Sequence, residues 1–271
     1  MITDITIGQY YKGDSFIHKL DARAKIILTI LVIALIFLCK NFISLAVTLL
    51  LVIISVILSS VPFKMYLKSL KPILPIVLFT AVLNLFYAGG ENVIFSFGKL
   101  SLTSEGIFTA VFLAVRIVLL IVASSILTYT TVPTMLTDAI EKLLSPLKLF
   151  KVPVQSWAMM MTLALRFIPT LVEEIEKITN AQKSRGADFE SGKLIQRIKA
   201  IIPIIIPLFV SSFRRASDLA YAMSCRCYTG ADTRTRMKQM KMKPRDFLCI
   251  SALVTAVVAV IMLNIKFGAV V

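Results

Sequence analysis

Five long apolar runs, separated by short polar breaks, set the pattern of this chain. They cover residues 26–39, 42–61, 72–88, 107–132 and 247–271. A helix needs roughly 20 apolar residues to cross the hydrocarbon core of a bilayer. The first run is shorter than this, but the flanking Lys25 and Lys40 can extend their charged ends toward the membrane surface. The pattern therefore predicts an all-α polytopic membrane protein with about five transmembrane helices.

Between positions 131 and 245 the pattern changes, because charged residues recur every few positions. Apolar residues there follow a three- and four-residue spacing, which is typical of helices with one apolar face. Three amphipathic helices are expected, at residues 133–150, 154–184 and 193–228. The most apolar stretch, residues 200–210, has about eleven residues and is too short to span a bilayer. No window in this region is long and apolar enough to cross, so we expect helices that are interfacial or buried in protein.

Turn-forming residues mark where these elements bend and end. Pro169 is expected to bend the first long amphipathic helix, and Gly186 is expected to end it. Pro203 and Pro207 are expected to bend the second long helix. The glycine-containing segment 89–106 interrupts the apolar runs with an alternating stretch, which predicts an external loop or a small hairpin.

Lysines and arginines are distributed unevenly, and this predicts which parts face the cytoplasm. The chain has 30 Lys and Arg against 15 Asp and Glu, and 19 of the basic residues lie between positions 133 and 245. Basic segments beside membrane spans mark cytoplasmic loops that face anionic lipid. With five crossings, the N-terminus is then inside and the C-terminus outside. The expected organisation is a cytoplasmic segment 1–25, four transmembrane helices in 26–132, cytoplasmic coupling helices in 133–243 and a fifth transmembrane helix in 244–271.

Composition excludes an ordinary soluble domain. The 271 residues are 58% hydrophobic, and the mean hydropathy is +0.86. The net charge of +15 could attract nucleic acid, but its concentration beside apolar runs favours the lipid bilayer as the partner. Cys225 and Cys227 are too close together and too isolated for a typical zinc site, and His18 lies far away in the sequence. We therefore expect neither nucleic-acid binding nor a metal site.

One arginine lies well inside an apolar run. Arg116 is the single charge of the fourth run, residues 107–132. An arginine in a membrane is costly and usually finds a protein partner or a water-filled pocket. Arg116 could therefore pair within the helix bundle, reach an interface or take part in transport.

Each long amphipathic helix ends in a tripeptide centred on an arginine. The two tripeptides are Ser184-Arg185-Gly186 and Cys225-Arg226-Cys227. A guanidinium binds carboxylates through two parallel hydrogen bonds and stays charged at any cellular pH. Either arginine alone could be a solvated helix end that the helix dipole favours. Their paired occurrence favours two docking contacts for two similar receptors.

Three further segments carry motifs over nearly the whole chain. SFIHKLDARAKI, before the first span, contains Asp21, Arg23 and Lys25, and TTVPTMLTDAIEKLLSPLKLFKVP precedes the long helices. The third segment is LALRFIPTLVEEIEKITNAQKSRGAD, with Arg166, Phe167, Pro169, Glu173 and Glu174. These segments resemble the Asp-Pro-Arg-x-Lys motif, the linker helix and the first Ala-Arg-Gly-type signature of one family. The chain resembles the transmembrane T component of energy-coupling factor (ECF) transporters, the ATP-driven vitamin and trace-metal importers of prokaryotes.

The resemblance implies a scaffold in the prokaryotic plasma membrane. In this family two homologous ABC-type ATPases, which bind ATP and magnesium, dock on the long coupling helices. A small hydrophobic substrate-binding subunit, the S component, packs against the same helices. Arg185 would then contact one ATPase and Arg226 the other. This sequence has no P-loop of the form G-x-x-x-x-G-K-[ST], so the chain is expected to be no enzyme and to bind no cofactor itself.

Two positions depart from the family pattern. Ala22 stands where proline is common, and Cys225-Arg226-Cys227 replaces an Ala-Arg-Gly form. Because the arginine is present, the departure affects only the neighbouring packing. Residues 159–161, all methionine, and the isoleucine-rich stretch 201–206 could form an adaptable surface for partners or pack the coupling helices together.

Two other functions remain as alternatives. A membrane-embedded enzyme could use the carboxylates of Asp138, Glu141, Glu173, Glu174 and Asp188. No nucleophile and base pair or metal cluster accompanies them at a useful spacing. An autonomous secondary transporter would be expected to show repeated spans with broken helices, and no such repeat is obvious.

Overall fold

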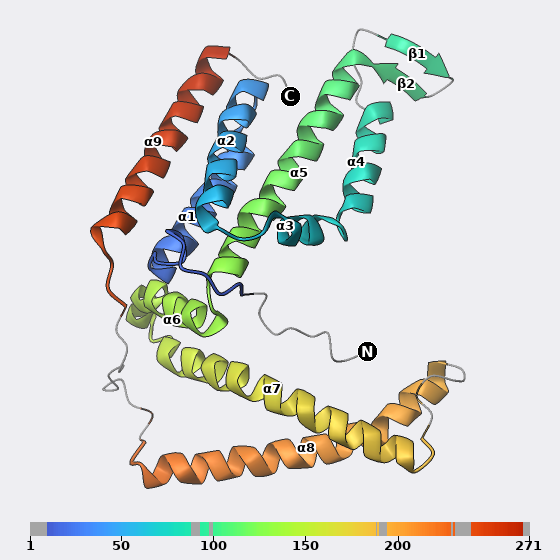
Figure 1. Ribbon diagram of the computed structural model, residues 1–271, viewed down its shortest axis with the longest axis vertical. Helices are drawn as coiled ribbons and strands as arrows, with labels where there is room; N and C mark the ends of the chain where they lie inside the picture. The colour runs from blue at the N-terminus through green and yellow to red at the C-terminus, as the bar shows by residue number, and fades with distance from the viewer. Residues whose placement is uncertain are drawn as a thin grey trace. The chain divides into compact units, whose positions relative to one another are not determined.

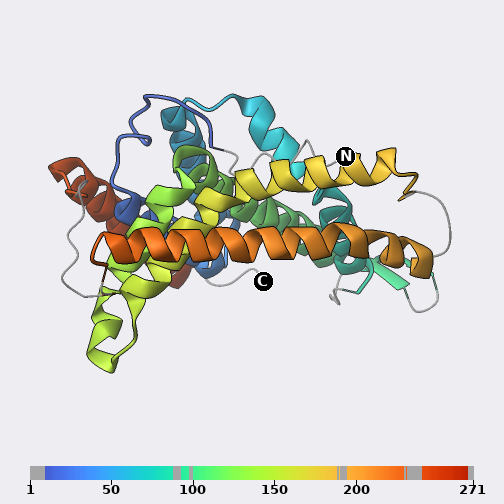
Figure 2. The ribbon, with the colours of Figure 1, turned by 90° about the horizontal axis from the view of Figure 1, so that it is seen from below.

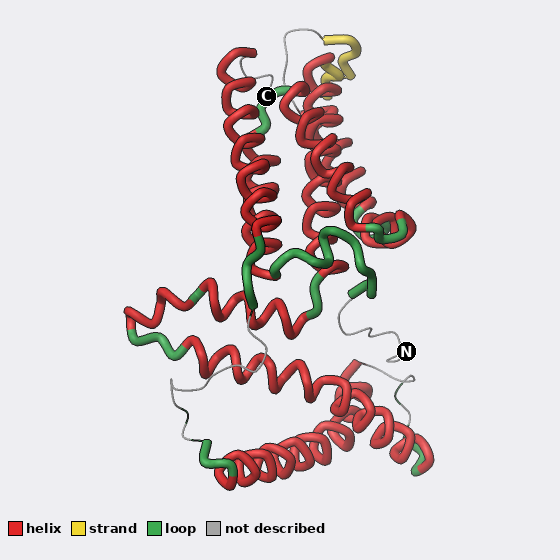
Figure 3. Tube along the Cα trace, turned by 60° about the vertical axis from the view of Figure 1, so that its left-hand side comes forward, coloured by secondary structure: helices red, strands yellow, loops and turns green. Residues whose placement is uncertain are grey.

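The computed structural model describes residues 10–87, 93–97, 100–187, 189, 194–228, 230 and 240–267. Helices make up most of this part of the chain (Figures 1 and 3). The elements are α1 (Ala22–Leu38), α2 (Phe42–Ser59), α3 (Phe63–Leu70), α4 (Leu74–Tyr87), β1 (Val93–Phe97), β2 (Leu100–Thr103), α5 (Ser104–Thr130), α6 (Pro133–Leu143), the 3-10 helix η1 (Ser145–Phe150), α7 (Val154–Ser184), α8 (Leu194–Cys225) and α9 (Pro244–Phe267).

The chain divides into two compact units. The bundle unit holds the described residues up to Ala139 and from Met240 onward. The long-helix unit holds the described residues from Ile140 to 230, which include α7 and α8. The unit boundaries lie on either side of the basic region that the sequence sets apart.

In the bundle unit, α5 packs against α1, α2, α3 and α4, and α9 packs against α1 and α2. The core lies where α1, α2, α5 and α9 meet. Its buried members are Leu35, Ile36, Cys39, Leu45, Val52, Phe112, Leu119, Ala123 and Val260. At these positions the helices contact one another, while their remaining faces are apolar and exposed. The pattern is that of helices surrounded by hydrocarbon.

The helices of this bundle alternate in direction. At one end, Lys25 Nζ near the start of α1 donates to the carbonyl of Thr130, the last residue of α5, at 2.8 Å. At the other end, Asn264 Nδ2 near the end of α9 donates to the carbonyl of Leu38 at 2.7 Å. Ser44 Oγ near the start of α2 donates to Asn264 Oδ1 at 2.8 Å. Helices α1 and α9 therefore run one way, and α2 and α5 run the other.

Helix lengths and hydropathies agree with an all-α polytopic membrane protein. Among the described residues, Phe42–Ser59, Gly106–Thr130 and Pro244–Lys266 have mean hydropathies of 2.8, 2.6 and 2.6 and are long enough to cross a membrane. Helices α3 and α4 are bent by 59° and could together form another span. Helix α1 has 17 residues and corresponds to the short first apolar run, for which spanning stays a prediction. The expected fold class is confirmed.

One expectation about the basic region is wrong. Ile198–Cys225 of α8 is also long and apolar enough to cross a membrane, with a mean hydropathy of 1.4. The apolar stretch 200–210 is too short to span by itself, but the helix expected over residues 193–228 is continuous and carries further apolar residues beyond position 210. Its hydropathy is nevertheless about half that of the other candidate spans, because arginines interrupt its apolar side.

Three connections take a defined form. Strands β1 and β2 pair antiparallel, with Phe97 opposite Leu100, so the small hairpin expected between the third and fourth apolar runs is confirmed. The basic connection after α2 forms the short helix α3. The amphipathic helix expected over residues 133–150 is divided in two, because Pro146 near the start of η1 cannot continue α6.

Candidate functional site

The long helices α7 and α8 run in opposite directions, pack against each other and cross at an angle (Figures 1 and 2). A polar contact fixes their register. Arg215 Nη2 on α8 donates to Glu174 Oε2 on α7 at 3.0 Å, and Ser211 Oγ donates to Glu174 Oε1 at 3.2 Å. Arg215 Nη1 also donates to Thr170 Oγ1 at 2.9 Å. Partly exposed ion pairs contribute at most about 1 kcal/mol, so this contact sets the alignment of the helices more than their stability.

The contact explains part of the family motif on α7. Glu174 faces α8, whereas Arg166 and Glu173 are exposed. Phe167 is half-buried, and its carbonyl accepts a hydrogen bond from the hydroxyl of Thr170 at 2.8 Å. Pro169 lies inside the helix, as predicted, and it lacks the N–H that would bond the preceding turn. Of these motif residues, Glu174 therefore aligns the two helices, whereas Arg166 and Glu173 face outward.

The end of α7 is a Schellman motif with Arg185 as the C-cap residue. The N–H of Gly186 donates to the carbonyl of Lys183 at 2.9 Å, and the N–H of Ala187 donates to the carbonyl of Gln182 at 3.0 Å. Gly186 has a φ of 85°, in the left-handed region. This combination satisfies carbonyls that the last helical turn leaves free. The prediction that α7 ends at Gly186 is confirmed.

The end of α8 repeats this geometry with Arg226 as the equivalent residue. The N–H of Cys227 donates to the carbonyl of Ser224 at 2.9 Å, and the N–H of Tyr228 donates to the carbonyl of Met223 at 3.1 Å. Cys227 occupies the glycine position with a φ of 56°. The two arginine tripeptides therefore share one backbone conformation. The sequence indicated two similar helix ends, but it did not reveal that a cysteine adopts the left-handed conformation.

The two arginines lie at opposite ends of the helix pair. Tyr228, two residues after Arg226, donates from its hydroxyl to Met159 Sδ near the start of α7, at 2.9 Å. Arg185 lies at the other end of α7, and both arginines are exposed. At a rise of 1.5 Å per residue, the arginines are separated by roughly 35 Å. A single small receptor could not contact both arginines.

An exposed apolar stripe runs along α8. Its residues follow the four- and three-residue spacing of one helix face and are Ile198, Ile202, Ile205, Phe209 and Phe213. Phe209 and Phe213 contact each other with ring centroids 4.6 Å apart. Between 47% and 64% of each of these residues is exposed, which is unusual for large side chains in an aqueous setting. Met160 and Met161 on α7 are also more than half exposed.

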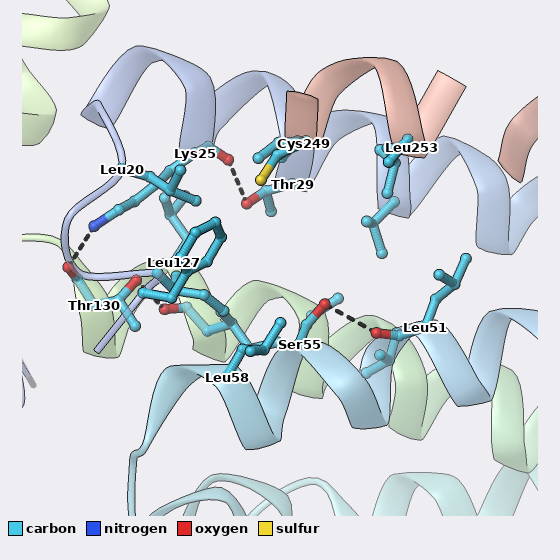
Figure 4. A pocket seen from close by; sticks show the side chains of 18 residues that line it. Leu20, Lys25, Thr29, Leu51, Ser55, Leu58, Leu127, Thr130, Cys249 and Leu253 are labelled. Carbon is cyan, nitrogen blue, oxygen red and sulfur yellow. Dashed lines mark hydrogen bonds between the residues drawn. The ribbon is translucent and has the colours of Figure 1, made fainter. Parts of the chain in front are cut away.

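The N-terminal motif lies in the bundle unit. Asp21 is the N-cap of α1, and its side chain accepts the N–H of Arg23 at 3.0 Å. Ala22 is the first helical residue and is buried. Proline is favoured at this position because the N–H there has no partner within the helix, so the departure at Ala22 fits the backbone. Lys25 follows on the same turn and reaches Thr130, as Figure 4 shows.

Arg116 finds partners inside the bundle. Its Nη2 donates to the carbonyl of Cys39 at the end of α1. Its guanidinium also lies over the ring of Phe112, 4.7 Å from the centroid, in a cation–π contact. Of the alternatives for Arg116, pairing within the bundle is confirmed.

The carboxylates considered for catalysis lie apart from any metal-binding group. Glu174 is paired with Arg215, Glu173 is exposed, and Asp188 lies outside the described residues. Asp138 and Glu141 belong to α6. Within the described ranges, no three His, Cys, Asp or Glu side chains lie close enough to hold a metal ion.

The described residues combine apolar helices long enough to cross a membrane with a long helix pair that ends twice in an arginine. The chain belongs to the CbiQ family, described as cobalt transport protein, which matches residues 13–238. The match covers the N-terminal motif and both arginine tripeptides.

Several relatives are similar over nearly their whole length. The chain is 52% identical over 267 residues to the energy-coupling factor transporter transmembrane protein EcfT of Ruminiclostridium cellulolyticum, covering 98% of this chain and 100% of that protein. It is 51% identical over 263 residues to EcfT of Clostridium kluyveri, covering 96% and 97%. It is 42% identical over 259 residues to EcfT of Lactococcus lactis, again covering 96% and 97%. The resemblance to T components is confirmed.

Replacing Cys227 by glycine should stabilise the end of α8. A non-glycine residue in the left-handed conformation costs about 1–2 kcal/mol, and glycine removes this cost. We expect the amide hydrogens of the last turn to exchange roughly fivefold more slowly, as about 1 kcal/mol implies. Cys225→Ala is the matched control, because Cys225 is the last residue of the helix itself. If the amide hydrogens of the last turn exchange at the same rate in Cys227→Gly as in wild type, the left-handed conformation of Cys227 carries no such cost.

Proposed function

We propose that this chain is the transmembrane coupling subunit of an ATP-driven ECF-type importer of vitamins or trace metals. The observation that carries the proposal is the pair of equivalent arginine caps at opposite ends of α7 and α8. The names of its relatives support it, since they are transmembrane proteins of energy-coupling factor transporters. In this role the chain transmits movement and performs no chemistry.

Two homologous ABC-type ATPases are the proposed partners of the caps. Two exposed guanidinium groups in the same backbone setting suit two similar receptors that offer carboxylates or carbonyls. Arg185 contacts one ATPase and Arg226 the other, with Ser184, Gly186, Cys225 and Cys227 shaping the two contacts. The ATPases bind ATP and magnesium. Their closure pulls on both ends of the helix pair at once.

The exposed stripe on α8 is the proposed seat of a small hydrophobic S component. A surface of isoleucine and phenylalanine is stable only against lipid or another apolar surface. The exposed Met160 and Met161 add side chains that can repack against different partners. This supports the adaptable surface over core packing as the role of the methionine and isoleucine stretches.

We place the N-terminal segment and the long-helix unit on the cytoplasmic side of the plasma membrane. The start of α1, the end of α5 and the start of α9 lie at one end of the bundle. The basic residues of the chain concentrate around these points, as the positive-inside rule requires. Although α8 has the length and hydropathy of a span, Arg214, Arg215 and Asp218 on its surface suit a helix at a membrane or protein surface.

Copurification tests the proposal directly. The tagged chain, extracted from its native membrane in a mild detergent, should carry two P-loop ATPases and one small hydrophobic membrane protein in comparable amounts. Mass spectrometry of the copurified proteins would also identify the S component, and with it the transported vitamin or metal. If the chain purifies without partners and turns over a substrate by itself, the proposal is wrong and the chain is an enzyme.

A further inference from the structure

A buried carboxylate joins the first turns of two helices in the bundle unit. Asp246, in the first turn of α9, is 2% exposed. Its Oδ1 accepts the N–H of Asp21 at 3.0 Å, and its Oδ2 accepts the N–H of Lys243 at 2.7 Å. Carboxylates are stabilised at helix N-termini by free N–H groups and the helix dipole. Separation of the starts of α1 and α9 would break the bond between the N–H of Asp21 and Asp246 Oδ1 and leave that oxygen without this donor.

Arg23 extends the contact to the point where the chain returns to the bundle. Asp21 Oδ1 lies 3.6 Å from Arg23 Nε, and Arg23 Nη2 donates to the carbonyl of Met240 at 2.7 Å. Met240 is the first residue of the bundle unit after the long-helix unit. The start of α1 therefore holds the incoming chain by a charge-assisted hydrogen bond.

Lys25 makes a similar contact at the end of α5, before the chain enters α6. Its Nζ donates to the carbonyl of Thr130 at 2.8 Å (Figure 4) and to the carbonyl of His18 at 3.3 Å. Lys25 is 6% exposed and Thr130 is 2% exposed, so the contact is shielded from water. Thr130 ends α5, and α6 begins at Pro133. The start of α1 thus holds the end of α5 as well.

An apolar cavity of about 220 Å³ lies beside Lys25 and Thr130. Its walls come from α1, α2, α5 and α9, and they include Leu51 and Leu253 (Figure 4). Side chains that border a void lack the van der Waals contacts of a filled core. The hydrogen bonds of Lys25 therefore join the helix ends at a place where packing contacts are fewer than in the core.

We propose that Arg23, Lys25 and Asp246 are positioning residues that transmit movement of the long-helix unit into the membrane helices. The first turn of α1 contacts Met240, where the chain returns from that unit, and Thr130, which precedes α6 and the unit boundary after Ala139. Displacement of either residue therefore moves α1, and α9 follows through Asp246. The inference rests on the proposed function, because the ATPases supply the movement.

The test uses the complete complex, reconstituted in liposomes with the ATPases and the S component that copurify with the chain. Arg23→Gln and Lys25→Met, combined, remove both contacts while keeping similar side-chain lengths. We expect assembly and ATP hydrolysis to stay within twofold of wild type. Uptake per ATP hydrolysed should fall at least fivefold, because movement no longer reaches the membrane helices. A conservative Arg23→Lys variant, with Lys25 intact, should recover most of the uptake.

Lys19→Met is the matched control, because Lys19 is exposed on the same segment. The transmission role would be overturned if uptake per ATP hydrolysed fell less than fivefold in the double variant. It would also be overturned if uptake fell only as much as the amount of assembled complex. The latter result would show that the residues merely stabilise the fold. Failure of the wild-type chain to recruit ATPases would overturn the proposed function itself, so the two failures are distinguishable.

Discussion

Replacing Arg185 and Arg226 together by glutamate should abolish ATPase docking and substrate uptake. Each substitution removes a forked donor and places a carboxylate against the acidic receptor that we propose. Truncating one partner of a buried charged interface contact costs about 2–5 kcal/mol, which weakens binding by roughly 30-fold or more. Two such losses at opposite ends of the helix pair leave neither ATPase anchored. The measurement is the amount of ATPase retained on the tagged chain, together with uptake in liposomes.

Single alanine variants refine this expectation. Arg185→Ala and Arg226→Ala should each weaken docking, and glutamate at either position should weaken it more than alanine because it adds repulsion. Arg166→Glu is a matched control, since Arg166 is an exposed arginine on α7 away from both helix ends. If the double glutamate variant assembles and transports like wild type, the arginine caps are not the docking contacts.

Replacing Phe209 by aspartate should release the S component while the ATPases stay bound. Phe209 is 62% exposed at the middle of the apolar stripe and contacts Phe213. Burying a phenylalanine contributes about 1.5–3 kcal/mol, and an unpaired carboxylate in an apolar interface adds a desolvation penalty. We expect the S component that copurifies with the chain to fall at least tenfold. Uptake should fall with it, since the substrate enters through that subunit.

Asp218→Asn provides the control for this variant. Asp218 is exposed on α8 nine residues after Phe209, which places it on the opposite side of a helix with 3.6 residues per turn. A charge change there should leave the S component bound. Retention of the S component by Phe209→Asp, or loss of the ATPases along with it, would show that the stripe has a different role.

Much of the fold follows from local sequence pattern. The boundaries of α7 agree with the apolar periodicity and the stop at Gly186, because a Schellman motif is encoded by neighbouring residues. The bundle helices follow from run length, since a bilayer fixes how many apolar residues a span needs. Helix α8 was predicted as one helix over residues 193–228, but its length as a candidate span was missed because Arg214 and Arg215 lower the average hydropathy beyond residue 210.

The candidate site was predictable in its residues but not in its arrangement. The paired arginines stand out in the sequence, whereas the antiparallel register that separates them depends on Glu174 meeting Arg215 across two helices. Opposite charges on helices joined by a short connection could have suggested that pair. Asp246 gives no such signal, because its contact with Asp21 joins residues that are 225 positions apart.

The register of the long helices also has a mechanical consequence. Glu174 and Arg215 join the helices at 3.0 Å, and each of them precedes the arginine at the end of its own helix by the same eleven positions. At 1.5 Å per residue, each arginine lies about 16 Å along its helix from this contact. The two arginines are therefore equivalent in distance as well as in backbone conformation. We expect symmetric closure of two ATPases to load both halves of the helix pair equally.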